Sequence, residues 1–597
     1  MQSRSTGVVK RSVALASAVL FLILVQQCDS DVEIAHPPEG MKQRFNAATS
    51  AELVHPEFLS AAPGVVESWK DMRVGMFICW GPVTLTGLEV GISRENRPTG
   101  PSGPTPKSTY DSLYKQWRPE RFEASTWIKT AHEMGARYVV FLVKHQDGFC
   151  LYDTKLTDYS VTGPESAWHR DVLKDVADAC HEAGIKLILY YSQVDYHHPD
   201  FKTADHQKYI DFLHGQIREL LTNYGRIDGL WFDCNGAADE WQSGKLFELA
   251  RSLQPWLIMN DRIGLPGDYV TFDNWVNYFQ RQPPWETNVT LNQQYAWQPQ
   301  SRIRSLKECI QLLVVCACGD GNFVLNAGPK PDGQIEQSQV ERFREIGAWL
   351  NKYGESIYNT RGGPLVAPNE KNRGVGNSFS FHIAEGNYWG GSTFRDSTIY
   401  VHILRWPADE IQLPLVGKKI LNHTVLTGGS AKLRQTSDGV FISIPASQRS
   451  ALDTIVKFDL DGPADDMPPT LHSGSLAYGK KTSASDSYSA FSPRFAVDDD
   501  DSTGWCALPG VRTASLEVDL GSAELVSRAI VREKYGRIRK FELQRFEADG
   551  WRTFFVGTTI GPNLELKFEP VRMQRVRLNI VECTFGPRIQ EFQLFKK

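Results

Sequence analysis

Short apolar runs alternate with amphipathic segments from Trp69 to residue 363, and this alternation constrains the fold more than any other feature. The apolar runs are typical of buried strands and the amphipathic runs of helices. The predicted strands are residues 74–80, 138–144, 186–191, 226–233, 256–260 and 322–326. The predicted helices are residues 123–134, 171–183, 205–223, 246–253 and 306–318. Repeated βα units favour a (β/α)8-like barrel. No glycine-rich nucleotide motif opens a helix, which weakens the alternative of a doubly wound sheet.

The 597-residue chain is too long for one hydrophobic core, so several domains are expected. Residues 31–64 are polar with scattered proline and predict a linker into the barrel of residues 65–363. Short alternating strands then predict a small β-sandwich over residues 364–460. A Pro- and Asp-rich linker at 461–469 leads to a second all-β domain at 470–597.

The first 30 residues have the pattern of a secretory signal peptide. Arg4, Lys10 and Arg11 precede an apolar run at 13–25 that is too short to span a membrane. The protein is therefore expected to be exported, to a secreted, periplasmic or lysosome-like location. No later stretch is apolar and long enough for a transmembrane segment. A net charge of -5 argues against a nucleic-acid partner, and the ten cysteines lack metal-ligand spacing.

The run at 226–233 ends abruptly in Asp233, directly after Trp231 and Phe232. A buried carboxylate costs several kcal/mol unless it is paired, so a structural role explains it poorly. The alternative is a helix N-cap, because Asp often opens a helix after a strand. Barrel enzymes carry their chemistry at the carboxyl ends of strands, which favours a catalytic acid.

A glycosidase needs a second carboxyl group, and Glu286 in the segment 281–286 is the first choice. Trp285 precedes it and could partly desolvate it, raising its pKa toward the range of an acid/base. The alternative is a solvated loop residue, and Asp273 and Glu89 are the reserves. His145 and Arg262 follow predicted strands, so they are expected on the same rim, although a core histidine and a salt bridge remain open. The sequence predicts no metal in this site.

Seven motifs together resemble the retaining α-L-fucosidase family of glycoside hydrolases. They are GMFICWGP at 75–82, KHQDGF at 144–149, LWFD at 230–233, NDR at 260–262, PWE at 284–286, NAGPKPDG at 326–333 and GESIY at 354–358. The PWE context and the long loop at 84–110 look most like the α-1,3/1,4-specific subgroup. The resemblance implies an exo-acting enzyme that releases α-linked L-fucose from an oligosaccharide or glycan by a retaining double displacement, with no catalytic cofactor.

By the same resemblance, Asp233 matches the nucleophile and Glu286 the acid/base. The positions that match fucose contacts are Trp80, Glu89, His145, Tyr191, Trp231 and Arg262. Cys79 and Gln146 replace two histidines of the family motifs, and both are expected in the substrate pocket. A thiol is a weak hydrogen-bond donor. The alternatives are therefore a hydrolase of a related sugar, such as a galactoside or a modified fucoside, and a catalytically silent glycan-binding protein.

The last domain resembles discoidin-like (coagulation factor 5/8 C-type) carbohydrate-binding domains. The similarity rests on AVDDDDSTGW at 496–505, LEVDL at 516–520 and RVRL at 575–578. It implies glycan binding, often with a structural Ca2+, for which the acidic run at 498–501 supplies suitable carboxylates. Trp505 is expected in the core.

Overall fold

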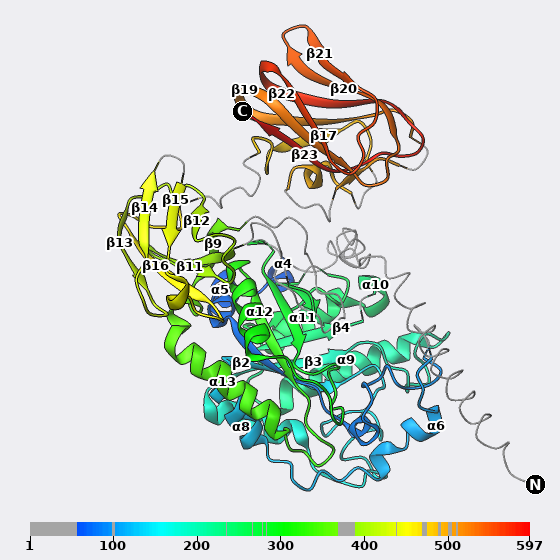
Figure 1. Ribbon diagram of the computed structural model, residues 1–597. Coiled ribbons are helices and arrows are strands. Elements are labelled where there is room, and N and C mark those ends of the chain that lie inside the picture. The colour runs from blue at the N-terminus through cyan, green and yellow to red at the C-terminus, as the bar shows by residue number, and fades with distance from the viewer. Residues whose placement is uncertain are drawn as a thin grey trace, which may run out of the picture. The chain divides into compact units, whose positions relative to one another are not determined.

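The computed structural model describes most of the chain beyond the N-terminal segment (Figure 1). The described residues are 56–97, 102–234, 236–265, 267–276, 279–281, 283–367, 389–436, 439–467, 475–487, 491–498, 504–508 and 511–596. The predicted signal peptide lies outside them. No helix among the described residues is both long enough and apolar enough to cross a membrane.

Eight parallel strands form the central sheet of the first domain. They are β1 (Val74–Ile78), β2 (Tyr138–Lys144), β3 (Lys186–Ser192), β4 (Gly229–Asp233), β5 (Ile258–Met259), β6 (Val270–Asp273), β7 (Trp285–Thr290) and β8 (Asn322–Ala327). Their order is β5-β4-β3-β2-β1-β8-β7-β6, and every pairing between neighbours is parallel. A parallel bridge from Asn260 to Tyr269 joins the two edges beside β5 and β6. The sheet therefore curls into the predicted barrel.

Helices connect most of these strands, as parallel pairing favours, but none lies between β5 and β6 or between β6 and β7 among the described residues. They are α4 (Pro56–Leu59), α5 (Pro63–Met72), α6 (Lys107–Tyr110), α7 (Ala124–Met134), α8 (Val172–Ala183), α9 (His206–Asn223), α10 (Ala238–Trp241), α11 (Ser243–Leu253), α12 (Leu306–Cys318) and α13 (Gln337–Tyr353). Short 3-10 turns lie at Pro82–Thr86, Leu113–Lys115 and Gly354–Ser356. Gly135 and Gly184 end α7 and α8 in the left-handed conformation, which glycine adopts without steric cost. Helical structure starts inside the segment predicted as a linker, because α4 and the first residues of α5 precede residue 65.

The barrel strands differ in how clearly their sequences mark them. Strands β1 and β2 are buried along their whole length, and their near-continuous apolar runs are the signature of parallel strands. Strands β6 and β7 carry threonine and asparagine instead, and the sequence did not predict them. Of the polar residues in these two strands, Asp273 and Asn288 line the pocket described below.

The second domain is the predicted small β-sandwich. Its strands are β9 (Arg361–Val366), β10 (Gly390–Arg395), β11 (Thr398–Ile403), β12 (Glu410–Leu413), β13 (Ile420–Val425), β14 (Lys432–Thr436), β15 (Gly439–Ser443) and β16 (Thr454–Leu460), with a 3-10 turn at Ala446–Gln448. Five of them pair in the order β13-β16-β11-β10-β9 and three in the order β12-β15-β14. Buried Ile399, Val456 and Val440 belong to one core between the two sheets.

The last domain is also all-β. Its strands are β17 (Lys481–Ala484), β18 (Trp505–Cys506), β19 (Ala514–Glu533), β20 (Ile538–Glu547), β21 (Gly550–Gly557), β22 (Leu564–Cys583) and β23 (Arg588–Phe595), with a 3-10 turn at Pro493–Ala496. Trp505 is fully buried in its core, as predicted. Cys506 and Cys583 are both free thiols. Most of the acidic run considered for calcium lies outside the described residues, so that site stays a prediction.

Candidate active site

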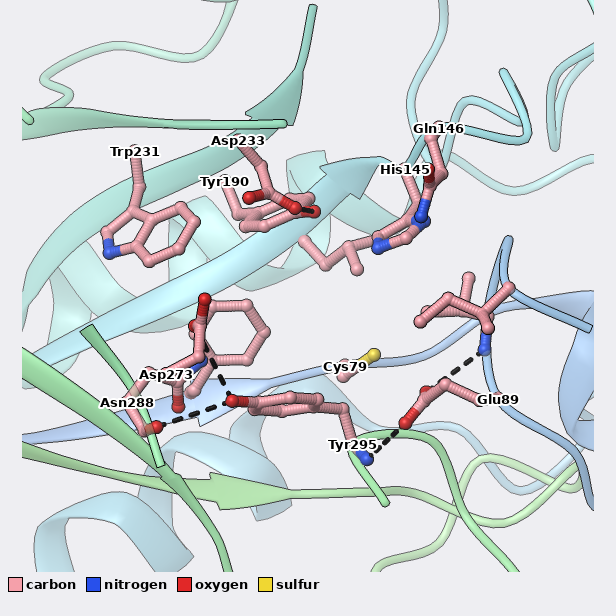
Figure 2. Close-up of a pocket in the computed structure, with 14 residues that line it drawn as sticks. Cys79, Glu89, His145, Gln146, Tyr190, Trp231, Asp233, Asp273, Asn288 and Tyr295 are labelled. Carbon is pink, nitrogen blue, oxygen red and sulfur yellow. Dashed lines mark hydrogen bonds between the residues drawn. The ribbon is translucent and has the colours of Figure 1, made fainter. Parts of the chain in front are cut away.

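A pocket lies at the carboxyl ends of the barrel strands (Figure 2). Strand ends and the loops that follow them supply its lining, which consists of Phe77, Cys79, Glu89, Val90, Ile92, Leu142, His145, Gln146, Tyr190, Trp231, Asp233, Asp273, Asn288 and Tyr295. The carboxyl ends of the strands are where (β/α)8 enzymes place their chemistry. Six of the predicted site residues line this pocket: Cys79, Glu89, His145, Gln146, Trp231 and Asp233.

Asp233 is the last residue of β4, and its side chain is 19% exposed. Its Oδ1 accepts a hydrogen bond from Arg262 Nη1 at 2.8 Å, and its Oδ2 accepts one from the Tyr190 hydroxyl at 2.6 Å. Burial raises the pKa of this carboxyl group, but the charge of Arg262 and the bond from Tyr190 outweigh burial and hold the pKa at about 2. Asp233 is therefore ionised at neutral pH and faces the pocket.

Arg262 joins Asp233 to a second carboxyl group. Its Nη2 lies 2.5 Å from Oδ2 of Asp273, the last residue of β6, while Nη1 binds Asp233. The guanidinium also lies over the Trp231 ring, 4.6 Å from the ring centroid. A planar guanidinium suits both contacts, because it can bind two carboxylates in one plane and stack on an aromatic face. In Figure 2, Asp233 and Asp273 lie on opposite sides of the pocket.

The alternative of a solvated loop residue does not hold for Glu286. Glu286 is the second residue of β7, is 1% exposed, and is absent from the pocket lining. Its Oε2 accepts a hydrogen bond from the Tyr138 hydroxyl at 2.5 Å, and its Oε1 accepts one from Trp231 Nε1 at 3.0 Å. The carboxyl group therefore lies inside the barrel, below the pocket.

Strand register sets this depth. Glu286 pairs with Thr271 of β6, whereas Asp273 pairs with Asn288, two residues farther along both strands. Two residues of a parallel strand span about 6.6 Å. Glu286 therefore belongs to a lower layer of the barrel interior than Asp273. Asp273 lines the pocket and can reach a ligand there.

Three predicted fucose contacts, Trp80, Tyr191 and Arg262, do not line the pocket, although Arg262 binds Asp233 and Asp273, which do. Trp80 is 1% exposed, donates its Nε1 hydrogen to the Lys330 carbonyl at 2.9 Å and packs against other aromatic rings. The Tyr191 hydroxyl donates to Gln216 of α9 at 2.7 Å. Successive residues of a strand point to opposite faces. Tyr190 therefore faces the pocket, and its neighbour Tyr191 faces the helices.

The two residues that replace family histidines both reach the pocket. Cys79 is 1% exposed, and burial, together with the charges of Glu89 and Asp147, raises the pKa of its thiol well above the usual range. The Gln146 side-chain oxygen accepts a hydrogen bond from the Tyr196 hydroxyl at 2.5 Å. A protonated thiol and an amide therefore stand where the family motifs carry imidazoles.

His145 is buried and stacks on Tyr190, with the ring centroids 5.6 Å apart and the planes 5° from parallel. Burial lowers the pKa of the His145 imidazole to about 4, so the ring is neutral at neutral pH. Its Nδ1 has no hydrogen-bond partner among the described residues. A neutral ring carries one donor and one acceptor, which suits contact with a hydroxyl group.

Glu89 connects two loops at the edge of the pocket. Its Oε1 accepts hydrogen bonds from the backbone amides of Val90 and Ala296, both at 3.0 Å, and its Oε2 accepts one from that of Tyr295 at 2.7 Å. Three backbone donors fix the carboxyl group in place. Glu89 therefore holds the pocket wall together, with its carboxylate oxygens already engaged.

Three residues with polar groups in the pocket lining were missed by the sequence analysis: Tyr190, Asn288 and Tyr295. The Tyr295 hydroxyl is 3.5 Å from Asp273 Oδ1 and 3.3 Å from the Asn288 carbonyl. Strand parity could have identified Tyr190 once Asp233 was assigned to the same side of the sheet. Tyr295 lies in a loop, and no sequence pattern indicated it.

A family model described as alpha-L-fucosidase matches residues 43–355, and one described as F5/8 type C domain matches residues 480–590. The first match spans more than half of the chain. The chain belongs to the alpha-L-fucosidase family. It is thus a glycoside hydrolase, and its last domain is of the F5/8 C type.

Curated relatives have the same activity in their names. The fucosidase is 25% identical to human tissue alpha-L-fucosidase over 494 residues, which cover 74% of this chain and 96% of that protein. It is 30% identical to alpha-L-fucosidase 1 of Arabidopsis thaliana over 322 residues, 47% of this chain and 59% of that protein. Together with the family match, these relatives support a fucose-releasing glycosidase.

Solved structures with the same fold are also fucosidases. Isoenzyme 1 of Paenibacillus thiaminolyticus superposes with a TM-score of 0.57 at 28% identity, covering 66% of this chain and 99% of that one. A fucosidase of Vibrio sp. strain EJY3 has a TM-score of 0.59 at 19% identity, covering 90% of this chain and 98% of that one. The second likeness supports the fold alone.

No group of three or more His, Cys, Asp or Glu side chains in the described part of the fucosidase is arranged to hold a metal ion. The donors that line the pocket are hydroxyl, amide, thiol and imidazole groups. These groups suit the hydroxyls of a sugar.

Proposed function

We propose that the enzyme releases α-linked L-fucose from glycan ends by a retaining double displacement in which Asp233 is the nucleophile. One observation carries this proposal: Asp233 and Asp273 face one pocket and share the Arg262 guanidinium. With a pKa of about 2, the Asp233 carboxylate is ionised and available to attack the anomeric carbon. A related enzyme from Bacteroides thetaiotaomicron has been captured as a covalent intermediate with a fluorinated fucosyl fluoride.

We assign the acid/base role to Asp273 in place of Glu286. Asp273 is 37% exposed, so it can exchange protons with water, and it lies across the pocket from Asp233. Retaining enzymes hold their two carboxyl groups about 5 Å apart, and inverting enzymes hold them about 6.5–9.5 Å apart. Two carboxylates bound to the two terminal nitrogens of one guanidinium are compatible with the shorter separation.

The charge of Asp233 suits both steps of this reaction. Before attack, the negative charge of Asp233 opposes the effect of Arg262 on Asp273 and favours the protonated form of Asp273, which donates its proton to the leaving oxygen. Once Asp233 forms an ester to the sugar, that charge is gone. Asp273 then remains ionised more readily and takes a proton from the water that hydrolyses the ester.

The alternative of a related sugar is favoured by a specific observation. Cys79 and Gln146 both line the pocket, and a thiol donates hydrogen bonds poorly. Losing one good polar contact costs about 1 kcal/mol, enough to change sugar preference. An aryl α-galactoside should therefore be tested beside the fucoside.

The test is hydrolysis of an aryl α-L-fucoside by the wild type, Asp233→Ala and Asp273→Ala, with Glu286→Gln as a third variant. Asp233→Ala should be inactive, and azide should rescue it as a fucosyl azide of inverted configuration. Asp273→Ala should keep most of its activity on fucosyl fluoride, which needs no proton, and azide should give the azide of retained configuration. First release of β-L-fucose, detected by NMR, would contradict retention.

Three further expectations are part of the proposal. The resemblance of the motifs favours α-1,3/1,4-linked substrates, which hydrolysis of a branched fucosylated trisaccharide against an α-1,2-linked disaccharide would test. Export is expected from residues 1–30, and N-terminal sequencing of protein from the medium should find them removed. Glycan binding with Ca2+ by the last domain is tested by calorimetry of the whole protein with and without a chelator.

A further inference from the structure

Glu286 crosses the barrel interior and connects three strands. From β7, it accepts hydrogen bonds from Tyr138, the first residue of β2, and from Trp231 of β4. Neither strand neighbours β7 in the sheet. The contact with Tyr138 depends on Gly75 of β1, because a Cβ there would lie 2.6 Å from the tyrosine ring.

An acid is an expensive residue for this place if its role is packing alone. Its side chain is 1% exposed, and an apolar residue of similar size would fill the same space without the desolvation cost. The Trp231 indole, which donates a hydrogen bond to Glu286, also lines the pocket. One face of that indole supports Arg262, whose guanidinium binds Asp233 and Asp273.

We infer that Glu286 is a positioning residue, whose carboxyl group holds the Trp231 indole and thereby places Arg262 between the two carboxylates of the pocket. This inference rests on the proposed function, because it assigns to Glu286 a role in the same reaction. Glu286 itself does not line the pocket. Its positioning effect on catalysis passes through Trp231.

The charge of Glu286 adds a second route to the same site. The ionisable groups that face it are Tyr138 from β2, Tyr269 beside β6, Arg262 after β5, and Asp273 at the end of β6. Burial raises the pKa of Glu286 to about 7, although the hydrogen bonds from Tyr138 and Trp231 oppose this. Above that pH, an ionised Glu286 favours the protonated form of Asp273, because like charges repel. Asp273 then keeps the proton that it donates to the leaving group up to a higher pH.

The Glu286 carboxyl group is the acceptor in its hydrogen bonds from Tyr138 and Trp231. The informative variants therefore separate the loss of its charge from the loss of its acceptor oxygens. Glu286→Gln keeps the shape and an oxygen for the Trp231 N–H, but removes the charge. Glu286→Leu removes the acceptor as well. Tyr138→Phe removes the other bond. Tyr269→Phe is the matched control, since this buried hydroxyl has no hydrogen-bond partner among the described residues.

The assay compares kcat/KM for an aryl α-L-fucoside and for α-L-fucosyl fluoride from pH 4 to pH 9, with thermal unfolding of each variant. Glu286→Leu should lose about 10- to 100-fold on both substrates alike, since it removes a hydrogen bond to a charged group. Glu286→Gln should stay within about fivefold of the wild type. The alkaline limb of its kcat/KM profile should nevertheless lie at lower pH than that of the wild type. Tyr269→Phe should leave kcat/KM and the pH profile unchanged.

Two results would overturn the inference, and a third would remove its electrostatic part. A loss in Glu286→Gln that is large for the aryl fucoside and small for the fluoride, with azide giving a retained product, would make Glu286 the acid/base. A loss in Glu286→Leu no greater than in Tyr269→Phe would make it structural only. An unchanged alkaline limb in Glu286→Gln would remove the electrostatic route.

Failure of the proposed function would be visible separately, as a wild type that cleaves neither substrate. Binding of free fucose, measured by calorimetry, then tests the inference without turnover. Weaker binding by Glu286→Leu than by Glu286→Gln would support positioning of the pocket through Trp231. Equal binding by the two variants would contradict it.

Discussion

Replacing Arg262 by glutamine should move the acid limit of catalysis to higher pH. Asp233 must be ionised to attack the sugar, and burial alone would raise its pKa. The opposing charge of Arg262, 2.8 Å from Oδ1, is the largest influence that lowers it, to about 2. Glutamine keeps a hydrogen-bond donor of shorter reach but removes the charge.

The size of the shift follows from that charge. An arginine next to an aspartate lowers the carboxyl pKa by about 1–3 units. Without it, the pKa of Asp233 should rise from about 2 to about 3–5. In the wild type, the lowered pKa keeps the Asp233 carboxylate ionised down to low pH. In Arg262→Gln the pKa is higher, so activity should be lost at a higher pH than in the wild type as the solution is acidified.

The assay should use fucosyl fluoride, whose departure needs no proton, so that the ionisation of Asp273 does not mask that of Asp233. Values of kcat/KM would be measured from pH 3 to pH 7, after confirming that each protein regains full activity when returned to pH 7. Arg251→Gln is the control. Arg251 is a buried arginine whose Nη2 lies 2.6 Å from Asp268 Oδ2, and neither residue lines the pocket. An acid limb that stays below pH 3 in Arg262→Gln would refute the reasoning.

Three stability predictions follow from the barrel, each checked by the thermal or urea unfolding transition of this domain. Asp320→Asn should cost about 3–5 kcal/mol, because Arg73, whose Nη2 lies 2.5 Å from Oδ1, would be left buried without its counter-charge. Ser305→Ala should cost about 1 kcal/mol by removing the N-cap of α12. Gly75→Ala should cost about 1–3 kcal/mol and lower activity, because its Cβ would displace the Tyr138 ring. An unfolding transition unchanged by Gly75→Ala would contradict the tight contact.

The sequence predicted those strands whose burial shows in their composition. Strands β1 to β4 and β8 are apolar runs, and the motifs at their ends led directly to Asp233 and His145. Strands β6 and β7 were missed because both are short and contain few apolar residues among threonine, asparagine and acidic residues. Polar residues inside a barrel resemble a surface loop in sequence, since only the tertiary structure supplies their partners.

The misplacement of Glu286 has the same physical origin. A Trp-Glu pair after two prolines has the composition of a loop, yet Trp285 begins a strand and Glu286 points into the barrel. Local composition does not encode how far along the barrel axis a strand begins. That depth depends on the register of β7 against β6 and β8, which is set by loops and packing elsewhere.

The position of a residue along its strand also determines the roles we propose for Asp233, Asp273 and Glu286. Asp233 and Asp273 end their strands, where each side chain is partly exposed and can meet a sugar and water. Glu286 is the second residue of its strand, where burial raises its pKa to about 7. In the proposed assignment, Glu286 holds the ring on which Arg262 rests, and Asp273 protonates the leaving sugar. The same carboxyl chemistry thus gives two different roles, because about two residues of strand separate the layers.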